Sequence, residues 1–234
     1  GARRFDGVFY RHLAHTARNA LRAPMLAWFG GALETVPFHG GVLKHYRQLA
    51  RFSAAFALLT DATLLSVGGG LKARQRLSGR MADVLVQLYY ASAVIKFWHD
   101  QGYPEEQRPL VEWSLQQNLS EIEVALRGAV DNFPVAVLRL PLRWLVFPPL
   151  CTRNAGPGDD LGRSVALSIV EYSPLRKLLA EGCYRNFEPE DPLGRVLNAY
   201  RLARETQNPL VVRLASADPR HLERLVPLLA ALAL

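Results

Sequence analysis

Apolar residues recur every three or four positions through most of this chain, and the strict alternation typical of strands is nearly absent. The pattern predicts a first helix from about Asp6 to Phe29, which the pair Gly30-Gly31 ends. Several apolar residues of this helix fall on one side: Phe9, Leu13, Ala17, Ala20 and Leu21. A connector over residues 34–41 follows, because Pro37 and two terminal glycines interrupt the helical pattern.

A second helix is predicted from about Val42 to Val67, and the run Gly68-Gly69-Gly70 ends it. Its first part alternates basic and aromatic residues. Its second part is nearly apolar on every side, which is typical of a helix buried between other helices. Ser78 is predicted to cap a third helix over residues 79–100. The inward stripe predicted for that helix is Met81, Val84, Leu85, Leu88, Ser92 and Ile95.

A fourth helix is predicted over residues 109–132, with Pro109 in its first turn. Its predicted inward residues are Leu115, Leu119, Ile122 and Leu126. Long helices joined by short turns, each with one apolar stripe, form antiparallel bundles. The sequence therefore predicts an all-α fold in which residues 1–153 form an antiparallel helical bundle.

The character of the chain changes towards its C-terminus. Residues 154–160 form a loop rich in Gly, Pro and Asp, which indicates a subdomain boundary. Residues 160–234 are predicted to form a smaller, Pro-interrupted helical part packed on the bundle. The alternative that both parts form one domain is left open. Asp218 is predicted to cap the last helix.

Charge and composition narrow the class of protein only in part. The 234 residues carry a formal net charge of +7, from 28 Lys and Arg against 21 Asp and Glu. A positive surface attracts anionic partners in general but selects none of them, and no nucleic-acid recognition motif is present. No uncharged apolar stretch reaches the roughly 18 residues of a membrane-spanning helix, so no spanning helix is predicted.

The cysteine pattern and the N-terminal residues bear on the setting of the chain. Cys151 and Cys183 are the two cysteines, and no CxxC motif occurs. This usage is typical of a reducing compartment, so we expect a cytoplasmic protein. The start, Gly1-Ala2-Arg3-Arg4, lacks an initiator Met and an apolar signal region, and we interpret it as a cut end.

Motifs that carry known chemistry are missing from the sequence. The histidines His12 and His15 share a helix spacing, but no HExxH motif or cysteine partner accompanies them. No GxSxG nucleophile turn occurs, and the triple glycine before Lys72 lacks the spacing of a phosphate-binding loop. The sequence therefore predicts no catalytic, cofactor-binding or metal-binding residue in this segment.

One tract, residues 133–150, mixes arginines and large apolar residues and contains no acid. Two interpretations stay open: a buried segment between helices, or a surface that contacts a membrane or a partner protein. The four prolines of the tract argue against one long amphipathic helix. The candidate surface residues are Leu138, Arg139, Leu142, Arg143, Trp144, Leu145 and Phe147.

A longer motif is the most distinctive feature of the sequence. It runs from Gly69-Gly70-Leu71-Lys72 through Leu77-Ser78-Gly79-Arg80 and Asp83 to Gln87-Leu88-Tyr89 and Ser92-Ala93. It fits the pattern GGxLKxxxxLSxRxxDxLxQLYxxSA at nearly every defined position. With Asp131-Asn132-Phe133-Pro134 and Asp191-Pro192-Leu193-Gly194, it resembles the C-terminal domain of bacterial long-chain acyl-CoA dehydrogenases of fatty-acid β-oxidation.

The resemblance implies a parent enzyme that uses FAD and removes the α,β hydrogens of a fatty acyl-CoA. In that family the flavin-binding regions and the catalytic glutamate precede this segment. The resemblance therefore implies an inactive segment that packs on the catalytic core, supports homo-oligomerisation or contacts the inner membrane peripherally, and meets acyl-CoA only through the parent. The competing hypothesis is a stand-alone helical binding module for an anionic membrane surface or an acidic protein partner.

Overall fold

The computed structural model describes residues 2–32, 42–149, 153–170, 174–184, 188 and 190–206. These residues form α-helices and two short 3₁₀ helices, and no strand occurs among them. The α-helices are α1 (Ala2–Trp28), α2 (Leu43–Ser66), α3 (Gln75–Asp100), α4 (Arg108–Asp131), α5 (Ala136–Val146), α6 (Asp159–Val170), α7 (Pro174–Leu179) and α8 (Pro192–Thr206). The 3₁₀ helices are η1 (Gly68–Ala73) and η2 (Glu105–Gln107). The all-α prediction is confirmed.

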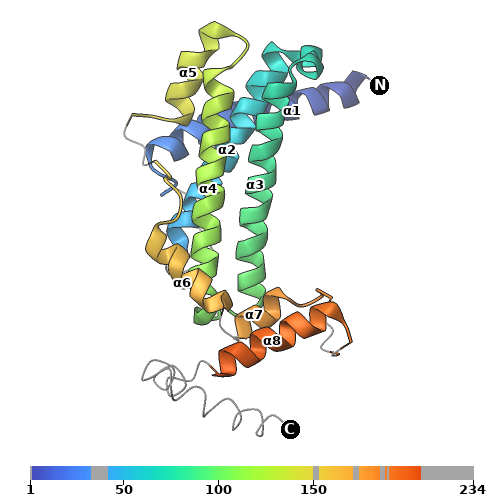
Figure 1. Cartoon of the computed structure of the whole chain (residues 1–234). Coiled ribbons are helices and arrows are strands. Elements are labelled where there is room, and N and C mark those ends of the chain that lie inside the picture. Colours follow the sequence, from blue (N-terminus) through green and yellow to red (C-terminus); the bar gives the residue numbers. More distant parts are fainter. Residues whose placement is uncertain are drawn as a thin grey trace, which may run out of the picture. The chain divides into compact units, whose positions relative to one another are not determined.

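The core of the bundle lies between α2, α3 and α4. Helices α3 and α4 lie side by side and make the most extensive helix–helix contact (Figure 1). Helix α2 packs on both of them, and α1 and α5 pack on each other and on α2. Large apolar residues buried almost completely there include Phe52, Leu59, Val84, Leu119, Ile122, Leu126 and Phe133. Their burial provides the main free energy that holds the helices together.

Helices α1 and α3 each end at a glycine, where the chain turns towards the next helix. At the end of α1, Gly30 adopts φ +57° and the Gly31 amide donates to the Leu26 carbonyl at 2.8 Å. At the end of α3, Gly102 adopts φ +78° and the Tyr103 amide donates to the Trp98 carbonyl at 3.0 Å. The end of α3 is a Schellman motif, in which a second bond runs from the Gly102 amide to the His99 carbonyl at 2.9 Å. In both helices a glycine takes the left-handed conformation after the last turn. The predicted ends of these helices are confirmed.

The start of α3 differs from the prediction. This helix begins at Gln75, and Ser78 lies inside its first turn, where its hydroxyl donates to the Gln75 carbonyl at 3.1 Å. Ser78 is therefore not a cap. The predicted inward stripe is right for Met81, Val84, Leu88 and Ile95, but Leu85 and Ser92 are exposed. Ala91 and Trp98 take the inward places.

The predicted face of α1 is also not the buried one. Phe9, Ala17, Ala20 and Leu21 are exposed, and the side chain of Leu13 lies outside the described set. The buried side of α1 is formed near its C-terminal end by Asn19, Ala23, Leu26 and Ala27. Asn19 donates to the Asp61 carboxylate of α2 at 3.1 Å. Spacing identifies an apolar face, but only the neighbouring helix decides which face is covered.

Helix α2 is the only helix in the described part of the chain that is long and apolar enough to cross a membrane. The sequence expectation concerned an uncharged apolar stretch, and it is not contradicted, because α2 contains Arg51 and Asp61. The core helix of a soluble protein has the same length and composition, and α2 packs against α1, α3 and α4. The finding is therefore weak evidence for a membrane span.

The chain divides into two compact units, Gly1–Lys177 and Leu178–Leu234. Helix α6 packs on α4 and belongs to the first unit, so the division falls after the loop at 154–160. Within the second unit, α8 begins at Pro192, where the Asp191 carboxylate accepts a hydrogen bond from the Leu193 amide at 2.7 Å. The connector at 34–41 and the Asp218 cap lie outside the described residues.

Candidate functional site

The predicted surface tract forms α5 and the turn after it. This short helix contains Pro141 and is amphipathic, although the prolines had argued against a long helix of that kind. Leu142 and Phe147 are buried in the bundle core, and Leu138 and Leu145 are partly buried against it. Arg139, Arg143 and Trp144 are exposed. The structure therefore divides the seven candidate residues between a buried side and an outer side.

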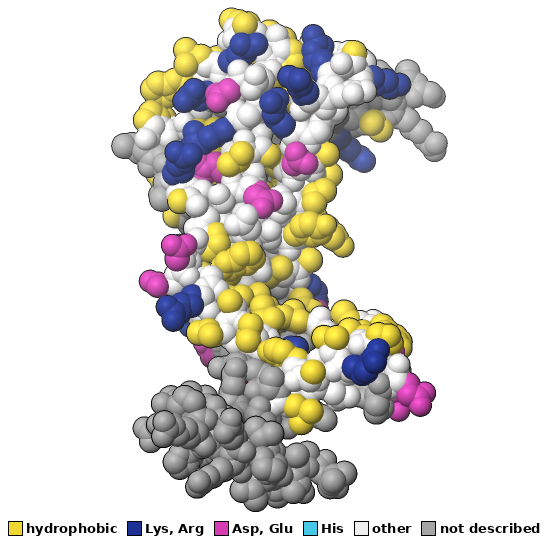
Figure 2. Space-filling model, viewed as in Figure 1, with side chains coloured by type: hydrophobic (Ala, Val, Ile, Leu, Met, Phe, Trp, Pro, Cys, Tyr) yellow, Lys and Arg dark blue, Asp and Glu magenta, His cyan; other side chains and the backbone are white. Residues whose placement is uncertain are grey.

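The outer side of α5 carries apolar residues that the prediction did not include. Val137, Leu140 and Trp144 are 77%, 64% and 50% exposed. Figure 2 shows hydrophobic side chains gathered over α5 with basic side chains beside them. We call Val137, Leu140 and Trp144 the outer α5 face. Residues at positions i, i+3 and i+7 lie on one side of a helix, so the spacing of these three residues in the sequence could have predicted this face.

The inner side of α5 is held by a buried arginine of α2. Arg51 is 1% exposed, and its Nη2 donates to the Val146 carbonyl at 3.3 Å. Its Nη1 donates to the Gln48 Oε1 at 2.8 Å, and its guanidinium lies 4.8 Å from the centroid of the Phe52 ring. A buried arginine is tolerated where hydrogen bonds and aromatic faces replace its hydration. Arg51 thus joins α2 to the end of α5.

A second buried charge anchors the loop that follows α5. The Glu123 carboxylate accepts hydrogen bonds from the Asn154 amide and the Asn154 side chain, both at 2.8 Å. It also accepts from Arg127 Nη2 at 2.8 Å. Burial by itself raises the pKa of Glu123, but the hydrogen bonds from Asn154 and Arg127 outweigh it, so the pKa lies below its ordinary value. The guanidinium of Arg127 also lies 4.1 Å from the centroid of the Phe147 ring.

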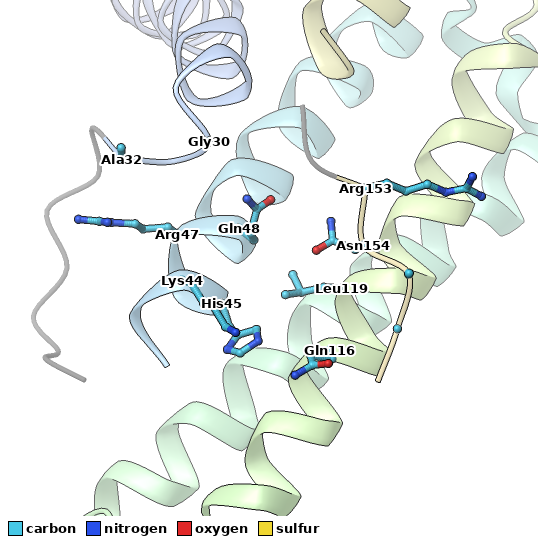
Figure 3. A pocket seen from close by; sticks show the side chains of 12 residues that line it. Gly30, Ala32, Lys44, His45, Arg47, Gln48, Gln116, Leu119, Arg153 and Asn154 are labelled. Carbon is cyan, nitrogen blue, oxygen red and sulfur yellow. The ribbon is translucent and has the colours of Figure 1, made fainter. Parts of the chain in front are cut away.

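A cavity of about 460 Å³ lies between the start of α2, helix α4 and the loop at 153–156. Three cations line it, Lys44, Arg47 and Arg153, and no carboxylate does. In Figure 3, Gln48 and Asn154 face the central space from opposite sides, whereas Arg47 and Arg153 extend outward at its edges. We call this space the α2 cavity. Sequence reasoning missed it, because its residues come from four separate segments, including Gly30 and Ala32 after α1.

His45 is the buried titratable group of the α2 cavity. It is 5% exposed, and its Nδ1 has no hydrogen-bond partner among the described residues. Burial, with a smaller contribution from the neighbouring Lys44, lowers its pKa to about 4. Glu112 opposes this shift weakly. The imidazole is therefore neutral at pH 7 and presents a polar edge without a charge.

Metal chemistry has no obvious ligand set in the described residues, where no three His, Cys, Asp or Glu side chains gather as metal ligands. A second basic cavity, of about 570 Å³, is lined by Arg74, Arg76 and Arg80 of the long motif together with Asn132 and Pro134. Neither this cavity nor the α2 cavity has a Phe, Tyr or Trp side chain among its lining residues, so no flavin contact is assigned to them.

The comparison with known families agrees with the fold and the motif. The family model described as "Acyl-CoA dehydrogenase, C-terminal, bacterial type" matches residues 1–224. The chain belongs to this family, so its parent enzyme class is the acyl-CoA dehydrogenases, which are oxidoreductases. No solved structure matches the chain. The long motif maps to η1 and α3, where Leu77 and Leu88 enter the bundle core and Leu85 and Tyr89 are exposed.

Proposed function

We propose that this chain is a structural domain of an FAD-dependent acyl-CoA dehydrogenase of fatty-acid β-oxidation and that it carries no part of the active site. The observation that carries the proposal is the family match over residues 1–224, on a bundle whose buried charges serve packing. Arg51 and Glu123 both hold helices and loops together. When bound by the parent enzyme, FAD would accept the hydride from the substrate; this chain would hold the catalytic core in its active form.

The surface proposed to meet the catalytic core is the exposed apolar side of α1. Phe9, Leu21 and Trp28 are all exposed large apolar residues of this helix. Exposed apolar groups that gather on one element mark interaction surfaces more often than isolated ones do. Packing against the catalytic core, or against the same surface of a second copy, would remove them from water. Homo-oligomerisation is part of the proposal on this ground.

The proposal is tested by combining this chain with the parent dehydrogenase truncated before Gly1. Palmitoyl-CoA-dependent reduction of an electron-accepting dye is measured for the truncated enzyme, for the chain and for their mixture. We expect activity only in the mixture, and less of it with Leu21→Glu/Trp28→Glu. Leu85→Glu/Tyr89→Glu, which adds the same charge to exposed residues of α3, should restore activity fully. A truncated enzyme with full activity would overturn the structural role.

Peripheral contact with the inner membrane is a second proposed role, and the outer α5 face supports it. Exposed Val137, Leu140 and Trp144 beside Arg139 and Arg143 combine apolar and basic groups, as interfacial helices do. Such a helix enters the headgroup region of an anionic bilayer without crossing it. An acidic protein partner would be recognised by the same groups, so this surface also serves the stand-alone alternative.

Flotation with vesicles containing anionic lipid tests this second role. We expect the chain to float with these vesicles, and Leu140→Ser/Trp144→Ser or Arg139→Glu/Arg143→Glu to remain at the bottom of the gradient. The matched control is Leu85→Ser/Tyr89→Ser, which removes exposed apolar groups from α3. Equal flotation of all variants, or none by the unmodified chain, would contradict membrane contact by α5.

A further inference from the structure

The first turn of α2 has an unfavourable distribution of charge. The positive end of a helix dipole lies at its N-terminus, where acidic side chains or caps normally stabilise the unpaired amides. Helix α2 has no acidic residue in its first turn and no side-chain hydrogen bond at its cap position, Val42. Lys44 lies in this turn and Arg47 follows it, while the buried His45 between them is neutral. Cations beside the positive end of a helix raise the free energy of the fold unless an anion lies near them.

The α2 cavity lies at this turn, and its walls carry polar groups that could bind a ligand. Besides the three cations, its walls carry the amides of Gln48, Gln116 and Asn154, and Leu119 lies between them (Figure 3). Because the Gln48 Oε1 accepts a hydrogen bond from Arg51, the NH₂ group is the end of this amide that remains as a donor. Asn154 is held in place by its two hydrogen bonds to Glu123. The polar groups of the cavity are thus positioned by the bundle.

Two buried polar atoms of this cavity have no hydrogen-bond partner among the described residues. They are the Nδ1 of His45 and the Nε of Arg47, and both side chains line the cavity. An unpaired buried polar atom costs about 1–3 kcal/mol, so native proteins seldom leave one without a ligand or water. The side chain of His45 is more than nine-tenths buried. These atoms are a second indication of a ligand, independent of the charge.

We propose that the α2 cavity binds the phosphate group of a small molecule or of a lipid headgroup. A phosphate carries up to two negative charges and several acceptor oxygens, which suits amide donors on the walls and cations around the edge of the cavity better than a carboxylate does. The amides at the start of α2 add the anion preference of a helix N-terminus. The second basic cavity, at Arg74 and Arg76, contributes no buried atom without a partner among the described residues, so the α2 cavity is the site we assign.

Binding is measured by titration calorimetry on the full 234-residue chain at constant ionic strength, in a buffer free of phosphate. The probes are inorganic phosphate, coenzyme A, and vesicles of phosphatidic acid in a neutral lipid. We expect saturable binding of at least one probe, weakened about tenfold or more by Lys44→Gln and by Arg47→Gln, because each removes a charge-assisted contact. Lys44 is exposed, so Lys44→Gln tests the site without risk to folding.

The matched controls are Lys72→Gln and Arg76→Gln, which remove the same charges elsewhere on the bundle. Binding of the soluble probes identifies a small-molecule phosphate as the ligand, and binding of the vesicles alone identifies a lipid headgroup; both support the site if the two α2 variants weaken it. Failure of all three probes to bind overturns the proposal. So does an equal loss in the controls, which would reflect net charge, or a loss in Arg76→Gln alone. None of these outcomes depends on dehydrogenase activity.

Discussion

At the scale of single residues, buried ionisable groups control how the stability of this bundle depends on pH. The pKa values of His45 and Glu123 are both below their ordinary values, but His45 is a base and Glu123 is an acid. The fold keeps His45 neutral and Glu123 ionised. Both groups therefore make the folded state less stable as the pH falls, over two different ranges of pH.

His45 acts in the higher range. Its pKa of about 4 in the folded state lies below the ordinary 6.5, so the unfolded chain binds a proton there at a higher pH than the folded chain does. The contribution of His45 to stability is complete above pH 6.5 and is lost as the pH falls towards 4. We expect a loss of about 3 kcal/mol in unfolding free energy over this range. Urea denaturation in phosphate-free buffers measures it, and His45→Gln should flatten the slope; an unchanged slope would contradict the assignment.

Glu123 acts in the lower range. Its ionised form is stabilised by Asn154 and Arg127, so its contribution is present above the unfolded pKa and is lost as the pH falls through the folded pKa. Glu123→Gln should lower the unfolding free energy by about 1–3 kcal/mol at pH 7, because Arg127 and Asn154 lose a charged acceptor. The difference in unfolding free energy between Glu123→Gln and the unmodified chain should disappear in strong acid, where Glu123 is protonated. Glu106→Gln, an exposed acid, is the control and should change stability by less than about 0.5 kcal/mol.

At the scale of elements, the end of α1 shows how one backbone position directs a helix. Both glycines of the turn have positive φ, but they differ in their surroundings. A Cβ on Gly31 would lie 2.4 Å from the Arg47 carbonyl oxygen, whereas a Cβ on Gly30 would meet nothing within 4 Å. The backbone of Gly31 thus lies directly against the backbone of Arg47 in α2, beside the α2 cavity.

Substitution of these glycines separates the two effects. Gly30→Ala should cost about 1 kcal/mol, the penalty for a side chain in the left-handed conformation. Gly31→Ala should cost more, about 3 kcal/mol, because the same penalty is joined by a clash with backbone that cannot rotate away. Thermal and urea unfolding of the two variants give the comparison. An equal loss of unfolding free energy in the two variants would contradict the close contact between Gly31 and the Arg47 backbone.

At the scale of the whole molecule, the division after Lys177 is the main organising feature. The hydrophobic core cluster lies entirely within the first unit, from Ala23 to Phe147. A unit with its own core is expected to fold without the rest of the chain. The packing of the second unit on the bundle stays a prediction.

A chain that ends at Lys177 tests this division. We expect it to keep a helical circular dichroism spectrum and to unfold in one cooperative transition, because all the packing between α2, α3 and α4 remains. A chain that ends at Val146 is a useful comparison, because it loses the contacts of Phe147 and Asn154 with the bundle. Gradual, non-cooperative melting of the longer chain would contradict an independent first unit.

The sequence by itself determined the all-α class, the bounds of the second and fourth helices within one or two residues, and the glycine ends of α1 and α3. These depend on local periodicity and turn chemistry, which act between residues close in the chain. It also determined the family, through the motif that begins at Gly69. The tertiary structure alone decided which face of α1 is covered and that Leu85 is exposed. It also brought Lys44, His45 and Asn154 together around one cavity. The reason is physical: burial and electrostatic surroundings depend on segments about 110 residues apart, and no local pattern records which of them meet.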